Sequence, residues 1–437
     1  MIYNEVLKDP SKFNFEIVQL GQCLNDTPIK ASEYIESDER IAFSSQVKNI
    51  IHQYETKRCL PSFEKAGPRN RIFFEPLTTK AAIVTCGGLC PGLNTVVKGI
   101  VKTLIEEYGV EKVVGIRYGY KGLTSETKTK PIKLNSDFVD QLHSKGGTCL
   151  GSSRGNQSPV EMVDQLIEQN INLLFCIGGD GTLKGAQSIA NEIMKRGLNI
   201  GVVGIPKTID NDLSFVEKTF GFETSVEIAT QIITSAHCEA ESAEYGVGIV
   251  KLMGRDSGFI AATSSLANSV VDFCLIPELP FTLDGENGLL KSISRRLEQK
   301  KHLVIVVAEG AGQSLFSGMK ERKDDSGNIL KEDIGNLLKD KISNYFSSTQ
   351  APITIKYLDP SYYIRSVPPV ASDAIFCYQL AEHAVHAGMA GKTNMVVGHW
   401  NNFFTHVPIS LATTERKMVD IKGSLWRSVT SSTQQDI

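Results

Sequence analysis

The feature that most constrains this chain is an alternation of short apolar runs with amphipathic segments, which begins near residue 79. Apolar runs of strand length lie at 80–86, 110–117, 171–179, 199–206, 245–254, 302–310 and 352–358. Between two of them, Val97, Ile100, Val101 and Leu104 recur at helical spacing. Strands that alternate with helices predict parallel, doubly wound sheets. We therefore expect an α/β fold that binds ligands beyond the carboxyl ends of its strands.

The two ends of the chain depart from this alternation. Residues 1–78 are polar and weakly periodic, and we interpret them as an N-terminal extension that packs on the main body. Towards the other end, 372–388 predicts a long helix and 394–409 predicts a hairpin. The charged, glycine-containing segment 321–333 predicts an exposed insertion.

Composition narrows the function classes. Charged residues make up 22% of the chain and its net charge is −3, so nothing favours nucleic acid or an anionic membrane as a partner. Nine scattered cysteines are a poor disulfide framework and indicate reduced thiols in a cytoplasmic compartment. The N-terminus lacks a signal-peptide pattern, and every apolar run is shorter than the roughly 18 residues of a membrane span.

Three loops that follow apolar runs carry residues suited to phosphate. In "TCGGLCPGLN" (85–94), Gly87 and Gly88 let the backbone approach a ligand closely, and the N-terminus of a predicted helix follows. In "LGSSRGNQ" (150–157), Arg154 stands where a guanidinium can bridge phosphoryl oxygens. Taken alone, the first loop is also typical of an ordinary strand–helix turn, and the second of a surface arginine.

The strongest short signal is the third loop, "IGGDGT" (177–182). Asp180 is placed to hold Mg²⁺ through oxygen, together with waters. Gly181 and Thr182 begin the next predicted helix, where backbone N–H groups can face a nucleotide. A purely structural turn does not need so many glycines around one acid.

Later loops carry groups suited to an alcohol that accepts a phosphoryl group. In "PKTIDND" (206–212), Asp210 and Asp212 face the same side of an extended chain, so one can act as general base while the other orients the hydroxyl. Arg255, in "MGRDSGF", is a candidate ligand of a substrate phosphate, and Glu278, in "IPELP", of a substrate hydroxyl. Each of these residues taken alone also fits a solvated turn, but together they form the parts of a phosphoryl-transfer site.

With these motifs in order, the sequence closely resembles the 6-phosphofructokinase family. The matching motifs run from "TCGGLCPGLN" through "GGDGT", "PKTIDND", "MGRDSG" and "PE" to "SYYIRS" and "VVGHWNN", over about residues 72 to 420. No Walker A pattern is present. The resemblance implies transfer of the γ-phosphoryl group of ATP, or of a phosphoryl group of pyrophosphate, to the 1-hydroxyl of fructose 6-phosphate, a step of glycolysis.

The resemblance also assigns roles by position. It places the donor phosphates and Mg²⁺ at Gly88, Arg154, Gly155, Gly179, Asp180, Gly181 and Thr182, with Asp180 as the metal ligand. It makes Asp210 the general base, with Thr208, Lys207 and Arg154 beside it in catalysis. It places the acceptor at Thr208, Asp210, Asp212, Met253, Gly254, Arg255, Glu278, Tyr362 and Arg365, and at Lys356, where a family arginine often binds the sugar phosphate from a neighbouring subunit.

Two positions bear on the phosphoryl donor. Pyrophosphate-dependent relatives usually carry Asp where this chain has Gly181, and a carboxylate there would repel a nucleotide phosphate. Lys207, in contrast, matches the pyrophosphate enzymes. An ATP-using branch found in protists and some bacteria combines this glycine with this lysine, so we expect ATP as the donor. Pyrophosphate is the alternative; an enzyme of the NAD-kinase or lipid-kinase type, or an inactive regulatory relative, fits the motifs less well.

The resemblance further implies two lobes with the active site between them. One comprises 79–221 plus about 366–414 and binds ATP, and the other comprises 222–365 plus about 415–437 and binds fructose 6-phosphate. It also implies a homotetramer under allosteric control. Gly246 stands where many members have an arginine that reaches across a subunit interface, and Lys98 and Lys102 lie roughly where bacterial relatives bind effectors, although a solvated helix face also explains them.

Overall fold

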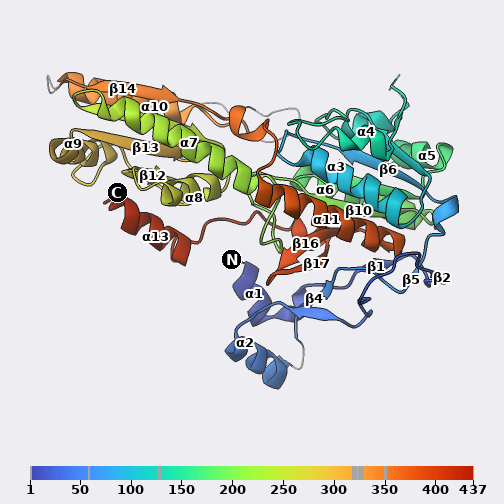
Figure 1. The fold of residues 1–437 in the computed structure, drawn as a ribbon. Coiled ribbons are helices and arrows are strands. Elements are labelled where there is room, and N and C mark those ends of the chain that lie inside the picture. The colour runs from blue at the N-terminus through green and yellow to red at the C-terminus, as the bar shows by residue number, and fades with distance from the viewer. Residues whose placement is uncertain are drawn as a thin grey trace. The chain divides into compact units, whose positions relative to one another are not determined.

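The computed structural model describes residues 2–57, 60–125, 129–316, 322, 329–348 and 352–436. The chain forms two compact units. Unit 1 comprises Met1–Thr208, Leu213–Gly221 and Val367–Glu415. Unit 2 comprises Ile209–Asp212, Phe222–Ser366 and Arg416–Ile437. Each unit is built around a sheet of its own (Figure 1).

Unit 1 contains a nine-stranded sheet in the order β3-β4-β17-β16-β10-β9-β6-β7-β8. Its parallel centre consists of β16 (Met395–Trp400), β10 (Gly201–Pro206), β9 (Leu173–Gly178), β6 (Lys80–Thr85) and β7 (Lys112–Ile116). Antiparallel strands complete both edges: β8 (Ile132–Lys133) beside β7, and β17 (Phe403–Pro408), β4 (Ser62–Lys65) and β3 (Arg40–Ala42) beside β16. Every residue of β9 and β10 is buried, which is expected for central strands covered on both faces.

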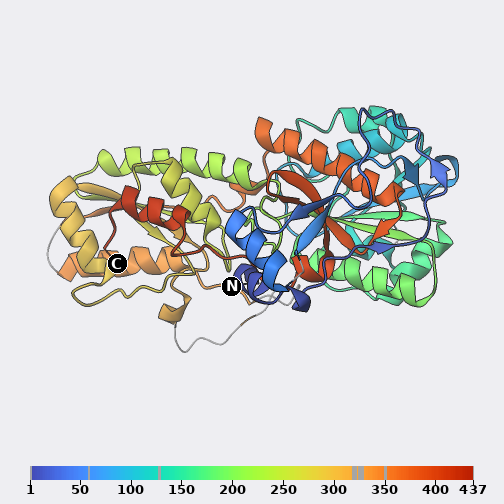
Figure 2. The same ribbon diagram turned by 90° about the horizontal axis from the view of Figure 1, so that it is seen from below.

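Helices cover both faces of this sheet (Figure 2). α3 (Leu93–Lys102) packs against α11 (Ala371–Met389), and Gly99 allows their close approach because a Cβ there would press on Ala381. α5 (Pro159–Glu168) packs against α6 (Asp180–Lys195). Unit 1 also contains the short helices α1 (Ile2–Lys8), α2 (Val47–His52), α4 (Ser136–Asp140) and α12 (Ile409–Ala412). Two strand pairs lie outside the main sheet: β1 (Val18–Gln19) pairs with β15 (Lys392–Thr393), and β2 (Asn25–Asp26) pairs with β5 (Arg71–Ile72).

The N-terminal segment becomes part of this sheet. β4 pairs with β17, so that Lys65 lies opposite Thr405, and β3 pairs with β4. Aromatic rings join this edge to the rest of unit 1, since Phe43 stacks on Trp400 at 5.2 Å and Phe63 meets Phe215 edge-on at 6.1 Å between ring centroids. The polar character of residues 1–78 gave no sign that they add two edge strands to the main sheet.

A buried charge network holds the same edge. Glu64 accepts hydrogen bonds from Arg69 at 2.9 Å and from Lys392 at 3.0 Å, and its Oε1 lies 3.1 Å from Nδ1 of His406. Burial alone would raise the pKa of Glu64, but the hydrogen bond from His406 and the ammonium of Lys392 outweigh burial and lower it to about 2. The carboxylate is therefore the centre of a network that links the N-terminal segment to β15 and β17.

Unit 2 contains a four-stranded parallel sheet in the order β12-β13-β11-β14. Its strands are β12 (Phe273–Leu275), β13 (His302–Ala308), β11 (Gly246–Leu252) and β14 (Thr354–Leu358). Its helices are α7 (Phe222–Glu241), α8 (Phe259–Ala267), α9 (Leu289–Lys300), α10 (Ile334–Ser348) and α13 (Ser424–Thr433). The apolar side chains of α9 and α10 form one buried cluster with those of β11 and β13.

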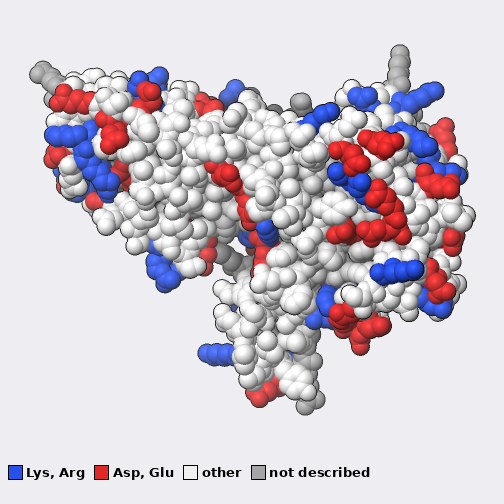
Figure 3. Space-filling model, viewed as in Figure 1, with Lys and Arg blue, Asp and Glu red and all other residues white. Residues whose placement is uncertain are grey.

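The strands and helices expected from the apolar pattern are confirmed: each predicted strand run contains a strand, 372–388 lies within α11, and 394–409 forms the β16–β17 hairpin. Most of the expected insertion, 321–333, lies outside the described residues. Basic and acidic side chains are intermixed on the face that Figure 3 shows. Among the described residues, no helix has the length and apolar character needed to cross a bilayer.

Substitution of Glu64 tests the charge network. Glu64→Gln should lower the free energy of unfolding by about 3–5 kcal/mol, because it leaves buried cations without their counter-charge. Chemical denaturation measures the loss. Glu16→Gln is the matched control, since Glu16 is 77% exposed in its 3.3 Å pair with Arg40, and should change stability by less than about 0.5 kcal/mol.

The network also predicts a pH dependence. A folded pKa of about 2 lies below the ordinary glutamate value of about 4.3, so the stabilisation is complete above that value and is lost as the pH falls towards 2. Glu64→Gln should flatten this acid limb of the stability profile. If the loss of stability at low pH is the same in Glu64→Gln as in the wild type, then Glu64 is not its source.

Candidate active site

The first group of predicted residues lies at the carboxyl ends of parallel strands in unit 1. β6 leads to β7 on one side of the sheet, whereas β9, which is paired with β6, leads to β10 on the other side. The order of the strands therefore reverses between β6 and β9. In open α/β sheets, ligands bind at such a reversal, beyond the carboxyl ends of the strands. The loops that follow β6 and β9 are 85–94 and 177–182, the two glycine-rich motifs of the sequence.

Two hydrogen bonds tie the loop after β6 to the loop that carries Arg154. The N–H of Gly87 donates to the carbonyl of Ser153 at 3.1 Å, and the hydroxyl of Ser152 donates to the carbonyl of Gly87 at 2.6 Å. Gly87 has φ +83°, a conformation that favours glycine. Arg154 and Gly155 directly follow these serines, so the structure brings the predicted Arg154 loop to the predicted glycine loop. The side chain of Arg154 is exposed.

Lys207 joins the loops after β6, β9 and β10. Its ammonium donates to the carbonyl of Gly88 at 2.7 Å, and its backbone N–H donates to the carbonyl of Gly178 at 3.0 Å. Gly179 lies close to the backbone of Lys207, where a Cβ would come within 3.2 Å of the lysine carbonyl. Lys207 itself is only 5% exposed. The structure thus brings Gly88 and Gly179, two residues expected at the donor site, to Lys207, which was expected to act in catalysis; Thr208 is the next residue in the chain.

The N-terminus of α6 lies in this group. Gly179 is its N-cap and Asp180 its first residue. Thr182 is buried, and its carbonyl accepts a hydrogen bond from Tyr120 at 2.7 Å. Nothing in the described structure outside the helix's own backbone lies within 4 Å of a Cβ built on Gly181, so there is open space beside the first turn of the helix. Such a helix end favours an anionic ligand.

Asp180 is the residue of this group that can hold a metal. Its side chain is 22% exposed and forms an ion pair with Lys184 at 3.0 Å, one turn along α6. Mg²⁺ is commonly bound by one or two carboxylates together with waters and substrate phosphates. A partly exposed carboxylate beside open space fits that mode of binding.

The second group lies at the carboxyl ends of the strands of unit 2. Met253, Gly254 and Arg255 follow β11, Glu278 follows β12, and Tyr362 and Arg365 lie in the segment after β14. Gly254 has φ +130°, and a Cβ there would come within 2.6 Å of the Ser257 carbonyl. The guanidinium of Arg365 lies over the ring of Tyr362 at 4.9 Å.

Lys356 is not brought to this group. It lies in the middle of β14 and forms a 3.2 Å ion pair with Glu239 of α7. Its predicted role, binding the sugar phosphate of a neighbouring subunit, stays a prediction.

Asp210 and Asp212 belong to unit 2, where they lie among acids and arginines. Asp212 is 5% exposed and pairs with Arg416 at 3.0 Å, and Arg416 also lies 3.3 Å from Asp256. Asp210 is partly exposed as a residue, but its Oδ1 atom is shielded from water, and its backbone carbonyl accepts a 3.3 Å hydrogen bond from Ser257.

The surroundings of Asp210 change its acidity. Desolvation, together with the negative charges of Asp212 and Glu309, raises the pKa of Asp210 above the ordinary aspartate range, and the positive charges of Arg416 and Arg255 oppose this rise. A carboxyl group with a raised pKa is a stronger base once ionised. It is therefore suited to accept a proton from an alcohol near neutral pH.

Glu278 offers an oxygen to a ligand. Its Oε1 accepts two backbone hydrogen bonds, from Gly258 at 2.9 Å and from Val419 at 2.8 Å, which fix the carboxylate in place. Its Oε2 is buried and has no hydrogen-bond partner among the described residues. A buried acceptor without a partner is costly and points to a missing donor, such as a ligand hydroxyl.

Two charged residues of this site were missed in the sequence. Arg416, which bridges Asp212 and Asp256, lies more than 200 positions away from Asp212 and stands in no recognised motif. Glu309 follows β13 directly, and burial raises its pKa while the charge of Arg255 opposes the rise. An acid directly after an apolar strand run was a signal that could have identified Glu309.

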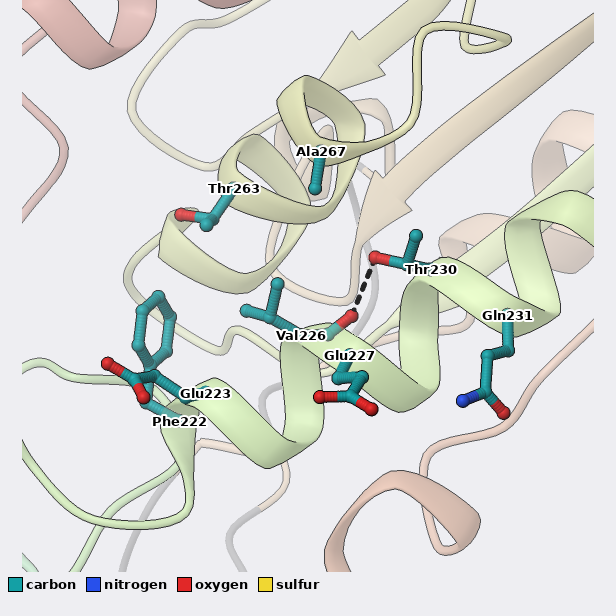
Figure 4. Close-up of a pocket in the computed structure, with 8 residues that line it drawn as sticks. All are labelled: Phe222, Glu223, Val226, Glu227, Thr230, Gln231, Thr263 and Ala267. Atoms are coloured by element: carbon teal, nitrogen blue, oxygen red, sulfur yellow. Dashed lines mark hydrogen bonds between the residues drawn. The ribbon is translucent and has the colours of Figure 1, made fainter. Parts of the chain in front are cut away.

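The other positions singled out in the sequence have structural explanations. Lys98 and Lys102 both pair with Asp140, at 3.0 and 3.1 Å. At Gly246, a Cβ would clash with the carbonyl of Ala240, so the start of β11 requires glycine there. The groove between α7 and α8 that Figure 4 shows contains none of the predicted site residues; it is lined by Phe222, Glu223, Val226, Glu227, Thr230, Gln231, Thr263 and Ala267.

Comparison with known proteins places these features in a family. A model of the family described as phosphofructokinase matches residues 80–388. The chain belongs to the phosphofructokinase family. It is 50% identical over 438 residues to an ATP-dependent 6-phosphofructokinase of Borreliella burgdorferi, and the alignment covers 97% of each chain. It is 48% identical over 373 residues to the enzyme of that name from Trypanosoma brucei brucei, and the alignment covers 84% of this chain and 75% of the relative.

Solved structures of the family share the fold. A pyrophosphate-dependent phosphofructokinase from Marinobacter aquaeolei superposes with a TM-score of 0.67 at 20% identity and covers 82% of this chain and 91% of that one. The Pichia pastoris phosphofructokinase superposes with a TM-score of 0.64 at 23% identity, over 83% of this chain and 37% of that one. The α/β fold of parallel-rich sheets expected from the sequence is thereby confirmed.

Proposed function

We propose that this phosphofructokinase-family chain transfers the γ-phosphoryl group of ATP to the 1-hydroxyl of fructose 6-phosphate and yields fructose 1,6-bisphosphate, a step of glycolysis. The observation that carries the proposal is the shielded carboxylate of Asp210, whose pKa is raised among Asp212, Glu309 and two arginines. Asp210 lies only three residues along the chain beyond Lys207, which joins the glycine-rich loops of unit 1 that are predicted to bind phosphate. The relatives named above carry the same activity in their names.

The donor phosphates are assigned to the loops at the carboxyl ends of β6 and β9. The residues that hold them are Gly88, Arg154, Gly155, Gly179, Asp180, Gly181 and Thr182. Backbone N–H groups at the start of α6 and the guanidinium of Arg154 offset the negative charge of the phosphates. Asp180, which is paired with Lys184, would hold Mg²⁺, and the bound ion would supply positive charge to offset that of the phosphates.

The acceptor sugar is assigned to unit 2. Arg255 and Arg365 provide cations for the sugar phosphate, with Met253, Gly254 and Tyr362 beside them, and Oε2 of Glu278 accepts a hydrogen bond from a sugar hydroxyl. Asp210 takes the proton of the 1-hydroxyl as the phosphoryl group moves to that oxygen. Thr208 and Lys207 precede Asp210 in the same loop. Asp212, which is paired with Arg416, contributes a negative charge beside Asp210 that the arginine partly neutralises.

Pyrophosphate is the second candidate donor, and Lys207 is the observation that favours it. Its ammonium is already bonded to the carbonyl of Gly88, which fixes a positive charge beside the phosphate loop. Gly181 favours ATP, because the open space at this position accommodates a nucleotide phosphate that an Asp side chain would repel. We therefore assign ATP. A homotetrameric assembly, an effector site and a cytoplasmic location stay predictions.

Substitution of Asp210 tests the proposed base. Asp210→Ser should lower kcat by about 10²–10⁴-fold, because the hydroxyl loses its proton acceptor, with only a modest change in KM for the sugar phosphate. Steady-state assays with fructose 6-phosphate and MgATP measure both constants. Asp420→Asn, which changes an exposed carboxylate of unit 2, is the matched control and should behave like wild type. Near-normal turnover of Asp210→Ser would remove Asp210 from this role.

The raised pKa of Asp210 predicts a particular pH profile. A base must be ionised to act, so kcat/KM for fructose 6-phosphate should rise with pH through the neutral range. A carboxylate with an ordinary pKa would give a plateau above about pH 5 instead. Asp212→Asn should shift the rise to lower pH, because it removes a negative charge that disfavours ionisation of Asp210. A flat profile between pH 6 and pH 9 at about constant ionic strength would contradict this account.

Substitution of Gly181 tests the donor assignment. A Cβ at position 181 meets no neighbouring atom within 4 Å, but Gly181→Asp should lower kcat/KM for MgATP by at least about tenfold because it places a carboxylate beside the nucleotide phosphates. Gly181→Ala, which adds a Cβ without charge, is the control and should retain most activity. Equal losses in the two variants, or no loss in Gly181→Asp, would show that charge at this position does not select the donor.

A further inference from the structure

We propose that unit 2 carries a binding site for a divalent transition metal of the zinc class, formed by His237, Glu241 and His302. One donor atom from each of these side chains lies within 4.8 Å of the other two. None of the three has a part in the proposed kinase reaction. The site is therefore distinct from Asp180, the carboxylate assigned to Mg²⁺ in unit 1.

The fold explains why these residues meet. His237 and Glu241 lie one turn apart on α7, so their side chains share one face of the helix. His302 is the first residue of β13 and pairs with Gly246, the first residue of β11. α7 packs against both strands, and its last turn lies near their amino ends. The predicted acceptor-site residues of unit 2 lie at the opposite end of the sheet, where they follow the carboxyl ends of its strands.

His237 lacks a polar partner that would explain its position. Its Nδ1 atom is buried and has no hydrogen-bond partner among the described residues. Its Nε2 atom lies 3.8 Å from a carboxylate oxygen of Glu241, which is longer than a hydrogen bond. Its ring lies 5.1 Å from that of His302 between centroids, and the two rings are tilted by 56° to each other. The nitrogen next to Glu241 is therefore Nε2, and a metal ion between the two side chains would give Nε2 the partner that Glu241 is too far away to supply.

The donor set selects the kind of metal. Two imidazoles and one carboxylate, with the remaining positions open to water, suit Zn²⁺, Co²⁺ and Ni²⁺, whereas Mg²⁺ prefers oxygen ligands alone. Donor atoms around a tetrahedral zinc ion lie about 3.4 Å apart, given bonds of about 2.0–2.2 Å. The Glu241 side chain is 62% exposed, so it can close the remaining gap without disturbing the core.

The local charges also favour a cation. Glu241 is the last residue of α7, where the helix dipole is negative, and the last turn of α7 contains no basic residue. The nearest lysine in sequence is Lys301, and its ammonium is held at Tyr245, 2.9 Å from the phenol oxygen. The exposed thiol of Cys238 is adjacent to His237 in sequence and is the rival ligand that a test must exclude.

Titration of the full-length protein with Co²⁺, in the presence of excess Mg²⁺, tests this site through the visible absorption of the bound ion. Wild-type protein should bind one equivalent saturably. Glu241→Gln and His302→Gln should each weaken binding by at least about tenfold, because each removes a direct ligand. His143→Gln, which changes an exposed imidazole of unit 1, and Cys238→Ser are the controls and should bind like wild type.

A second measurement uses Zn²⁺ and thermal unfolding. Zn²⁺ should raise the unfolding midpoint of the wild type and of both controls, but not that of His302→Gln, because the bound ion joins α7 to β13 only in the folded state. In the absence of added transition metal, all variants should retain wild-type kinase turnover. The proposal is overturned if wild type shows no saturable Co²⁺ binding, if Glu241→Gln and His302→Gln bind like wild type, or if Cys238→Ser abolishes binding.

Discussion

Parallel strand pairing is the constraint on which this structure depends. Because neighbouring strands run in the same direction, their carboxyl ends meet at one edge of each sheet, and loops that are far apart in sequence meet there too. In unit 1 this edge gathers the loops after β6, β9 and β10. The buried Lys207 connects them, because it donates hydrogen bonds to the carbonyl of Gly88 and to the carbonyl of Gly178. In unit 2 the same rule gathers Arg255, Glu278 and Glu309.

The electrostatic balance in unit 2 gives that second edge its chemistry. Asp210 and Glu309 are carboxylates that burial makes costly to ionise, and the positive charge of Arg255 partly compensates for that cost at both of them. The balance leaves the pKa of Asp210 raised, so its proton affinity is matched to a reaction near neutral pH. Such an arrangement supports the proposed role of Asp210 as general base.

The central strands and the glycine-rich loops could be predicted because each carries a local signal. Runs such as 171–179 are too apolar for anything but a covered strand, and the loops follow them directly. β3 and β4 could not be predicted, since strands of three and four residues show little periodicity. They owe their pairing to β17 and to the rings around Phe63. Arg416 was missed for a related reason: its partners Asp212 and Asp256 are near in space but remote in sequence. Tertiary contacts alone also bring His302 to His237.

The central claim, that these loops hold a nucleotide and a sugar phosphate, is tested most directly by the donor preference of the purified wild-type protein. With fructose 6-phosphate as acceptor, kcat/KM is measured for MgATP and for pyrophosphate under the same conditions. The account predicts a higher kcat/KM for MgATP, because Gly181 leaves space for the nucleotide phosphates. A higher value for pyrophosphate would contradict it and would make Lys207 the residue that defines the donor.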